Sequence, residues 1–297
     1  MSGNGRQERA EAGERARTEP APEPAAGARA FHRLHHGERP FLLPNAWDHA
    51  SGAALAAHGF AAVGTTSLGV AAAAGLPDGE GVARDLTRAL GCALARLPVP
   101  VSVDIEGGFA DTPEAVAALA AELWRAGVAG VNIEDGRPDG TLTDPALHAA
   151  KVTAVKEAAP GLFVNARTDT HWLRADPTVR GALRRAETYA VAGADGVFVP
   201  GVSDEDTIAA LTSALAVPLN VLHSPALPSF DRLAALGVAR VSLGSSLFRA
   251  ALGHAVATAA ALAAGAGGAP ATAPRWAGSG TGVPPYADVQ ALAGHFA

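Results

Sequence analysis

Cysteine is almost absent from this 297-residue sequence, in which Cys92 stands alone. A single cysteine can form neither an intrachain disulfide nor a cysteine-built zinc site. Aromatic residues make up only 5% of the chain, so a hydrophobic core must be built mainly from Ala, Val and Leu. We therefore expect a cytoplasmic protein that is kept in a reducing compartment and stabilised by aliphatic packing.

The sequence also lacks a concentrated positive charge and a convincing membrane span. Its formal net charge is −6, so neither nucleic acid nor an anionic membrane is expected as a partner. The most apolar stretch, 250–264, is mostly Ala and contains His254, which predicts a packed helix. Residues 1–30 lack the apolar stretch of a secretory signal and are too acidic for a transit peptide, and we interpret them as a disordered tail.

What the sequence does contain is an alternation of short β-rich runs with helical stretches rich in Ala, Leu and Arg. Eight runs can be picked out, at residues 41–47, 61–67, 99–106, 130–135, 162–168, 196–200, 217–222 and 239–244. Several follow a Gly-containing turn, as expected where a helix ends and leads into a buried parallel strand. Eight such units in roughly 220 residues match the size of an α/β fold of the (β/α)8 TIM-type barrel kind.

The main alternative fold is a doubly wound open sheet, which usually places a Gly-rich phosphate loop after its first strand. Here the first predicted strand leads into Asn45-Ala46-Trp47-Asp48, without a phosphate-binding motif, which favours the barrel. We assign residues 31–264 to one catalytic barrel domain and residues 265–297 to a C-terminal linker and helix. These extra C-terminal helices could pack on, or be exchanged with, a neighbouring subunit.

Polar residues occur on three neighbouring predicted strands where a barrel interior normally holds Val, Ile or Leu. They are Asp104 and Glu106 on the third strand, Asn132 and Glu134 on the fourth, and Asn165, Arg167 and Asp169 on the fifth. Because residues two apart share a face of a strand, each set is expected to point to one side. Solvent readily explains one polar strand end, but three neighbouring ones predict a functional site at the carboxyl end of the barrel.

The charge balance of this predicted site indicates a cation. Asp104, Glu106 and Glu134 would place three carboxylates near one mouth, with Arg167 as the only strand-borne positive charge. Like charges held together in a partly desolvated site must protonate or bind a cation. Oxygen ligands favour Mg²⁺ or Mn²⁺, whereas zinc would require His or Cys beside the carboxylates.

Several motifs resemble, in the same order, those of the isocitrate lyase/phosphoenolpyruvate mutase superfamily. They are Pro-Asn-Ala-Trp-Asp at 44–48, Thr-Thr-Ser-Leu-Gly at 65–69, Gly-Leu-Pro-Asp at 75–78, Val-Asp-Ile-Glu-Gly-Gly-Phe at 103–109, Asn-Ile-Glu-Asp at 132–135, Asn-Ala-Arg-Thr-Asp at 165–169 and Ala-Arg-Val-Ser-Leu-Gly at 239–244. Each motif is short, but the ordered set is specific. The resemblance implies a barrel enzyme that acts on a small 2-oxo or 2-hydroxy acid and assembles as a homodimer or homotetramer.

The resemblance also implies roles for particular residues. Asp104, Glu106 and Glu134 would hold Mg²⁺, partly through water, while Asp78, Glu134 and Arg167 would act in catalysis. Arg167 would bind the substrate carboxylate through its guanidinium. From its place after the seventh predicted strand, a loop histidine is a further candidate acid or base. The predicted substrate-binding residues, besides Arg167, are Thr66, Ser67, Leu68, Gly69, Asn165 and His223.

The loop after the fourth predicted strand departs from the superfamily pattern. In the superfamily that this chain resembles, isocitrate and methylisocitrate lyases carry a Lys-Lys/Arg-Cys-Gly-His loop at this place. The phosphonate enzymes of the superfamily carry a Lys and an Asn there. Residues 134–142 are Glu-Asp-Gly-Arg-Pro-Asp-Gly-Thr-Leu and contain none of these groups. A decarboxylase or an unusual lyase needs less from this loop, because solvent can protonate an enolate.

The main hypothesis is therefore a Mg²⁺-dependent lyase that cleaves a C–C bond in a small 2-oxo or 2-hydroxy di- or tricarboxylate. The reaction would pass through an enolate-like intermediate, and decarboxylation is included. One alternative is a P–C bond enzyme, either a phosphonomutase or a phosphonopyruvate hydrolase. The other is a non-catalytic barrel that binds a 2-oxo acid.

Overall fold

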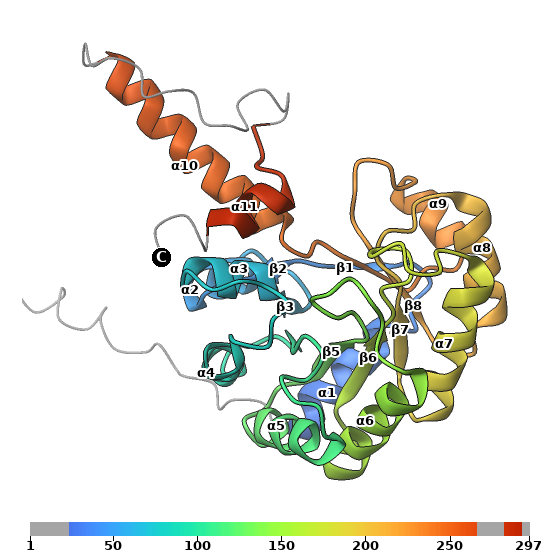
Figure 1. Cartoon of the computed structure of the whole chain (residues 1–297). Helices are drawn as coiled ribbons and strands as arrows, with labels where there is room; N and C mark the ends of the chain where they lie inside the picture. The colour runs from blue at the N-terminus through green and yellow to red at the C-terminus, as the bar shows by residue number, and fades with distance from the viewer. Residues whose placement is uncertain (1–23, 266–281, 293–297) are drawn as a thin grey trace, which may run out of the picture.

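A computed structural model describes residues 24–265 and 282–292 of the chain, and within them a single parallel sheet is surrounded by helices (Figure 1). The strands are β1 (Phe41–Leu43), β2 (Asn45–Ala46), β3 (Val63–Thr65), β4 (Val101–Asp104), β5 (Gly130–Glu134), β6 (Phe163–Arg167), β7 (Gly196–Phe198), β8 (Leu219–Leu222) and β9 (Arg240–Ser242). Their spatial order is β1-β9-β8-β7-β6-β5-β4-β3-β2. This is the order of a (β/α)8 barrel, and the predicted fold class is confirmed.

The barrel closes through the first predicted strand, which the structure divides into two short pieces at Pro44. β1 pairs with β9, and β2 pairs with β3 on the other side. Proline has no N–H to donate to a ladder, but the Pro44 carbonyl accepts a 2.8 Å hydrogen bond from Gly64 N. The two halves of one extended segment thus form both edges of the sheet, and eight predicted strands become nine.

The helices follow the strands in alternation, as expected for parallel pairing. They are α1 (Pro24–Leu34), α2 (His49–Ala57), α3 (Ser67–Ala73), α4 (Arg84–Leu94), α5 (Pro113–Arg125), α6 (Pro145–Ala158), α7 (Val179–Val191), α8 (Glu205–Ala214), α9 (Phe230–Ala235), α10 (Ser246–Gly265) and α11 (Tyr286–Leu292). Several begin at a capping side chain. Asp144, for example, accepts from the backbone N–H groups of Ala146 and Leu147, and Pro145 fills the first helical position.

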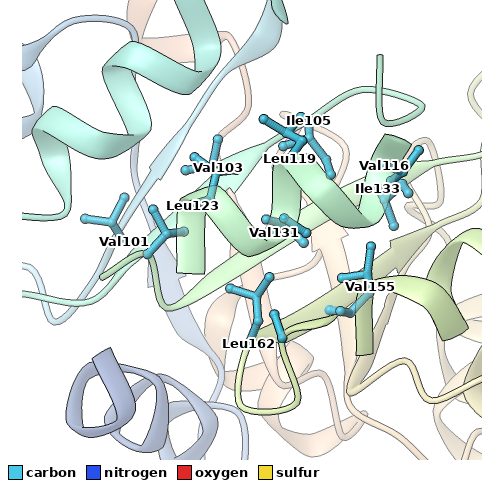
Figure 2. Packing of buried hydrophobic residues seen from close by; sticks show 14 of the residues in the cluster. Val101, Val103, Ile105, Val116, Leu119, Leu123, Val131, Ile133, Val155 and Leu162 are labelled. Atoms are coloured by element: carbon cyan, nitrogen blue, oxygen red, sulfur yellow. The ribbon is translucent and has the colours of Figure 1, made fainter. Parts of the chain in front are cut away.

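The strands send alternate side chains to two different layers. On β4 and β5 one parity, including Val103 and Val131, packs outward against the helices, as Figure 2 shows. Helix α5 meets these residues with an aliphatic face formed by Val116, Leu119 and Leu123. Burial of each such side chain contributes roughly 1.5–3 kcal/mol. Because this parity is fixed against the helices, the opposite parity must face the barrel interior.

Helix α1 covers the amino ends of β5 and β6. The Phe31 ring packs edge-on against Phe163 at a centroid distance of 5.4 Å, and His35 stacks on the same ring at 3.9 Å. The predicted tail boundary at residue 30 was too late, because α1 already begins at Pro24. Only residues 1–23 of the predicted tail lie outside the described residues. Phe31 and His35 are four residues apart on α1, so both rings lie on the helix face that packs against Phe163.

Helix α10 projects away from the barrel body in Figure 1. Its residues Ser246–Ala264 have a mean hydropathy of 1.4, and this is the one described helix long and apolar enough to cross a membrane by length and composition. Only 6% of that window is buried. The predicted helix is confirmed, but the expectation that it packs is wrong for the chain by itself.

Candidate active site

The register of the central strands brings the predicted polar residues together at the carboxyl end of the barrel. Asp104 pairs with Asn132, Asn132 pairs with Asn165, and one step further Glu134 pairs with Arg167. Neighbouring partners in a parallel ladder lie side by side with their side chains on the same face. The predicted shared parity of β5 and β6 is therefore confirmed.

Arg167 lies between two carboxylates. Its Nη1 is 2.6 Å from Glu134 Oε2, and its Nε donates to Asp169 Oδ1 at 2.6 Å. The guanidinium carbon lies 5.6 Å from the centroid of the Phe198 ring. Two of its three nitrogens are thus fixed by the protein, which leaves Nη2 to meet a bound anion. Asp169 therefore holds Arg167 in place.

Burial strongly affects the charges at this mouth. It raises the pKa of Asp104 above its ordinary value, with repulsion from Asp78 adding to the shift and Arg167 opposing it. Burial likewise raises the pKa values of Glu134 and Asp169, although Arg167 again opposes both shifts. Burial alone would lower the pKa of Arg167, but the surrounding carboxylates raise it and keep the guanidinium charged. Arg167 thus faces three carboxyl groups, those of Asp104, Glu134 and Asp169.

Glu106 departs from the simple strand alternation. β4 ends at Asp104, and Glu106 adopts a positive φ of 48°, a region that non-glycine residues rarely occupy. Its Oε2 accepts a 2.9 Å hydrogen bond from Gly81 N, while its buried Oε1 has no partner among the described residues. Burial and repulsion from Asp78 and Asp104 raise the pKa of Glu106 to about 7, against the Gly81 hydrogen bond. Strand alternation therefore does not determine the position of Glu106, because β4 has ended before it.

A cavity of about 880 Å³ opens at this mouth. Its lining includes these residues predicted from the sequence: Thr66, Ser67, Leu68, Asp78, Asp104, Glu134, Arg167 and His223. Three other predicted residues, Gly69, Glu106 and Asn165, are not in the cavity wall. The structure thus gathers most of the predicted site around one space.

The residues outside the cavity wall are displaced for identifiable reasons. Asn165 lies one layer below Arg167 and donates a 2.9 Å hydrogen bond to Asn132 Oδ1 inside the barrel. Gly69 is covered by neighbouring side chains, because a Cβ built on it would come within 2.7 Å of the Trp47 Cβ. Both residues were predicted to bind substrate, and neither lines the cavity. Asn165 supports the site from beneath.

The residues at the mouth fit a divalent cation in charge and in ligand chemistry. Asp78 Oδ1 and Glu106 Oε1 are both buried oxygens without a partner among the described residues. Mg²⁺ binds such oxygens and often keeps several of its waters. However, no three His, Cys, Asp or Glu side chains of residues 24–265 and 282–292 are grouped to hold a metal ion. A directly coordinating set of Asp104, Glu106 and Glu134 is therefore not preformed, because Glu134 turns to Arg167 and Glu106 to Gly81.

Sequence reasoning missed a buried arginine beneath the site. Arg240 is fully buried, donates through Nε to Ser242 Oγ at 2.9 Å and through Nη2 to Asn132 Oδ1 at 3.1 Å. Burial lowers its pKa to about 9, although Asp104 partly offsets the effect. Arg240 and Ser242 share the interior parity of β9, and that alternation was the available signal.

A second missed group fixes the β5 loop. Asp135, on the opposite parity from Glu134, is completely buried. Its Oδ1 accepts from Asp169 N at 2.8 Å, and its Oδ2 accepts from Tyr189 Oη at 2.6 Å and from Arg185 Nη1 at 3.1 Å. Asp135 thus fixes the backbone of the residue that holds Arg167. The adjacent Gly136 has no room for a Cβ, which would collide with the Asp169 carboxylate.

The cavity wall also contains residues that the sequence motifs did not indicate. Its apolar part includes Trp172, Leu173, Phe198, Val202, Leu222 and Leu247, and its remaining polar part includes Arg137, Arg249 and Tyr286. Tyr286 belongs to α11, so the C-terminal helix reaches the site. No short-range pattern connects that helix with the barrel strands.

Comparison with known proteins agrees with this fold. The sequence profile of the phosphoenolpyruvate phosphomutase family matches residues 31–263. The chain therefore belongs to this family, within the isocitrate lyase/phosphoenolpyruvate mutase superfamily, and it is an enzyme of that kind.

The names of individual relatives point to different activities. The chain is 50% identical to the uncharacterized protein Rv1998c of Mycobacterium tuberculosis over 223 residues, which are 75% of this chain and 84% of the relative. It is 32% identical to 2-methylisocitrate lyase of Bacillus subtilis over 206 residues, 64% of each chain. It also resembles a crystal structure of a Burkholderia cenocepacia protein proposed to be a phosphonomutase, at 39% identity and a TM-score of 0.73, covering 80% of this chain and 99% of that one.

Proposed function

We propose that the protein is a Mg²⁺- or Mn²⁺-dependent lyase that cleaves a C–C bond in a small 2-oxo or 2-hydroxy di- or tricarboxylate. The observation that carries this proposal is Arg167, fixed by Glu134 and Asp169 at a mouth with further carboxylates. The similarity to 2-methylisocitrate lyase supports cleavage of a C–C bond. Cleavage through an enolate-like intermediate includes decarboxylation as the simplest case.

Arg167 would bind the substrate carboxylate through its remaining guanidinium nitrogen. Arginine suits this task because its planar donors match a carboxylate and its charge persists when buried. Asp169 and Glu134 would keep the guanidinium from rotating, so the bound carboxylate has one orientation. Orientation of this kind lowers the barrier because its entropy is lost before the reaction.

The metal-holding residues in this proposal are Asp104, Glu106 and Glu134, partly through bound water, with Asp78 nearby. A divalent cation bound there would stabilise the negative charge that develops on the substrate oxygen. Asp78, whose carboxylate lines the cavity, would orient the substrate group or water that exchanges a proton. His223, on the β8 side of the cavity, would be a second polar contact for the substrate.

The cavity also suggests the nature of the distal half of the substrate. At about 880 Å³ it is larger than a three- or four-carbon acid requires. Apart from Arg167, the cavity wall contains apolar side chains, among them Trp172, Leu173, Leu222 and Leu247, and two further cations, Arg137 and Arg249. The apolar side chains favour an alkyl-substituted acid, because alkyl groups gain from leaving water there. A further substrate carboxylate would have to pair with Arg137 or Arg249, because an unpaired charge would be desolvated.

A P–C bond enzyme is the second candidate, and the similarity to the proposed phosphonomutase favours it. The loop after β5 speaks against it, because residues 134–142 lack the expected Lys and Asn. Arg137 of this loop lines the cavity and is a cation that a phosphonate could meet. The non-catalytic alternative finds no support in the comparisons.

A substrate panel separates these candidates. The metal-stripped protein, reconstituted with Mg²⁺, would be incubated with oxaloacetate, alkylmalates and phosphonopyruvate. A 2-oxo acid product without phosphate supports the lyase. Conversion of phosphonopyruvate to phosphoenolpyruvate, or to pyruvate with released phosphate, supports the P–C enzyme, as a mutase or a hydrolase respectively. Glu106→Gln, which keeps the size of the side chain, should weaken metal binding and remove activity without unfolding the protein. Normal turnover by Glu106→Gln would overturn the metal assignment.

We also propose a soluble, cytoplasmic homodimer or homotetramer. The support is the exposed α10, whose Leu262 is 71% exposed although the helix is apolar. A second copy could cover this surface or exchange the helix. Light scattering coupled to size exclusion should give a mass of two or four chains, and a monomer at micromolar concentration would contradict the proposal.

A further inference from the structure

The C-terminal segment 282–292 lies at the mouth of the barrel. In Figure 1, α11 lies beside the base of α10 and close to α3. Val283 and Tyr286 line the same cavity as Arg167. Val289 is completely buried, so α11 is anchored by packing as well as by polar contacts. The segment therefore forms part of the cavity wall.

Gln290 forms two hydrogen bonds with the backbone of Asp78. Its Nε2 donates to the Asp78 carbonyl at 2.9 Å, and its Oε1 accepts from the Asp78 N–H at 3.0 Å. One side-chain amide therefore satisfies both backbone groups of one residue 212 positions away in the sequence. Two hydrogen bonds in this paired arrangement fix both the place and the orientation of the peptide.

Tyr286 forms a hydrogen bond with the carboxylate of Asp78. The phenol donates a 2.5 Å hydrogen bond to Asp78 Oδ2. Burial and the Asp78 charge raise the pKa of Tyr286, so the phenol keeps its proton and remains a donor. Asp78 Oδ1 is buried and has no partner among the described residues, so the carboxylate has one fixed oxygen and one available oxygen.

The loop that carries Asp78 has little structure of its own. Gly79 and Gly81 adopt positive φ values of 76° and 71°, and no atom outside their immediate chain neighbours lies within 4 Å of a Cβ built on either. Glycine at such positions permits many backbone conformations. Glu106 fixes the loop at Gly81, but the position of Asp78 itself depends on α11.

The docked segment is in turn tied to the barrel. Arg249, near the start of α10, donates from Nη1 to the Pro284 carbonyl at 2.8 Å. Trp172, from the loop after β6, packs edge-on against Tyr286 with a centroid distance of 5.6 Å. Contacts from two different βα units thus hold the segment over the mouth.

We propose that Tyr286 and Gln290 are positioning residues of the active site, which set the place and orientation of Asp78 for the reaction. The C-terminal segment 282–292 is then a working part of the site. The catalytic consequence rests on the proposed function, whereas the physical tie to Asp78 does not. The two are tested by different measurements.

Two substitutions in the full-length protein test the catalytic consequence. Tyr286→Phe removes only the phenol oxygen and keeps the ring against Trp172, and Gln290→Met keeps the length but removes both hydrogen bonds. Each should lower kcat by about tenfold or more with KM changed less than about twofold, because misplacement of a catalytic group by about 1 Å can cost up to a hundredfold. Asp288→Asn on the same helix is the control and should match the wild type. Unchanged kcat, or a rise in KM alone, would overturn the positioning role.

Hydrogen–deuterium exchange of residues 75–83 tests the tie without any substrate. Exchange should be faster in Gln290→Met, which frees the Asp78 N–H, and unchanged in Asp288→Asn. Equal rates in Gln290→Met and wild type would overturn the proposal. If the wild type turns over no compound in the panel while this difference persists, the proposed function fails and the tie to Asp78 stands.

Discussion

The two ends of the barrel use the same strands for opposite purposes. On β6, Phe163 at the amino end is buried beneath α1 in a cluster of rings, whereas Arg167 at the carboxyl end sits among carboxylates beside a large cavity. One end buries apolar surface, and the other keeps charges whose pKa values are shifted by burial. The difference shows that stability and chemistry are assigned to opposite ends of a single strand of five residues.

This separation predicts that the largest loss of activity follows a change at the carboxyl end. Arg167→Met should lower kcat/KM by roughly a thousandfold, because the substrate carboxylate loses its buried cation, and loss of one partner of a buried charge pair costs binding about 2–5 kcal/mol. The neighbouring carboxylates can take up protons once the cation is gone, so the fold should survive. Steady-state kinetics and circular dichroism measure the two effects. Activity within tenfold of the wild type would show that the substrate carboxylate binds elsewhere.

A change at the amino end should have the reverse effect. Phe31→Ala removes the ring that packs on Phe163, and truncation of a buried aromatic typically costs about 3–5 kcal/mol of stability. Because the cavity is at the other end, kcat per folded molecule should remain that of the wild type. Urea unfolding gives the stability, and loss of kcat at full folding would contradict the separation of the two ends.

A substitution at the buried Asp135 should affect both stability and activity. Asp135→Asn should destabilise the protein by about 1–3 kcal/mol, because Tyr189 and Arg185 lose a charged acceptor. It should also lower kcat several-fold, since Asp135 fixes the backbone N–H of Asp169. Tyr189→Phe removes one hydrogen bond of the same group and leaves the Asp169 contact intact. If both variants lost the same kcat, the contact to Asp169 would not be the cause.

The smallest effect at neutral pH is expected from a buried histidine. Burial lowers the pKa of His148 from 6.5 to about 4, although the negative charge of Asp135 partly opposes this shift. The unfolded chain therefore binds a proton that the folded chain refuses, so this contribution to stability is complete above about pH 6.5 and is lost as the pH falls towards 4. His148→Phe should flatten the pH dependence of stability in this window, with a small change at pH 7.5. An unchanged slope would contradict the assignment.

Much of the fold and part of the site could be predicted from local patterns. The parity of Asn132 and Glu134, and of Asn165 and Arg167, correctly placed each pair on one face, because strand alternation is set by backbone geometry. The same rule did not apply to Glu106, since β4 had already ended at Asp104. A local period gives no warning of where a strand stops.

The features that the sequence did not reveal depend on contacts between distant segments. Pro44 divides the first strand because each half has a different partner, which becomes apparent only when the barrel closes. Tyr286 reaches Asp78 across 208 positions, and no motif links the two. Arg240 is accommodated by polar neighbours from β5 and β9 that a single strand pattern does not identify.

We propose that the carboxylates at the carboxyl end bind a hard cation beside Arg167, which stabilises negative charge on a substrate oxygen. Calorimetric titration of the metal-stripped protein with oxalate, which resembles an enolate, measures this binding without turnover. Oxalate should bind tightly in the presence of Mg²⁺, hardly at all in EDTA, and less tightly to Asp104→Asn with Mg²⁺. Equal affinity for oxalate with Mg²⁺ and with EDTA would contradict it.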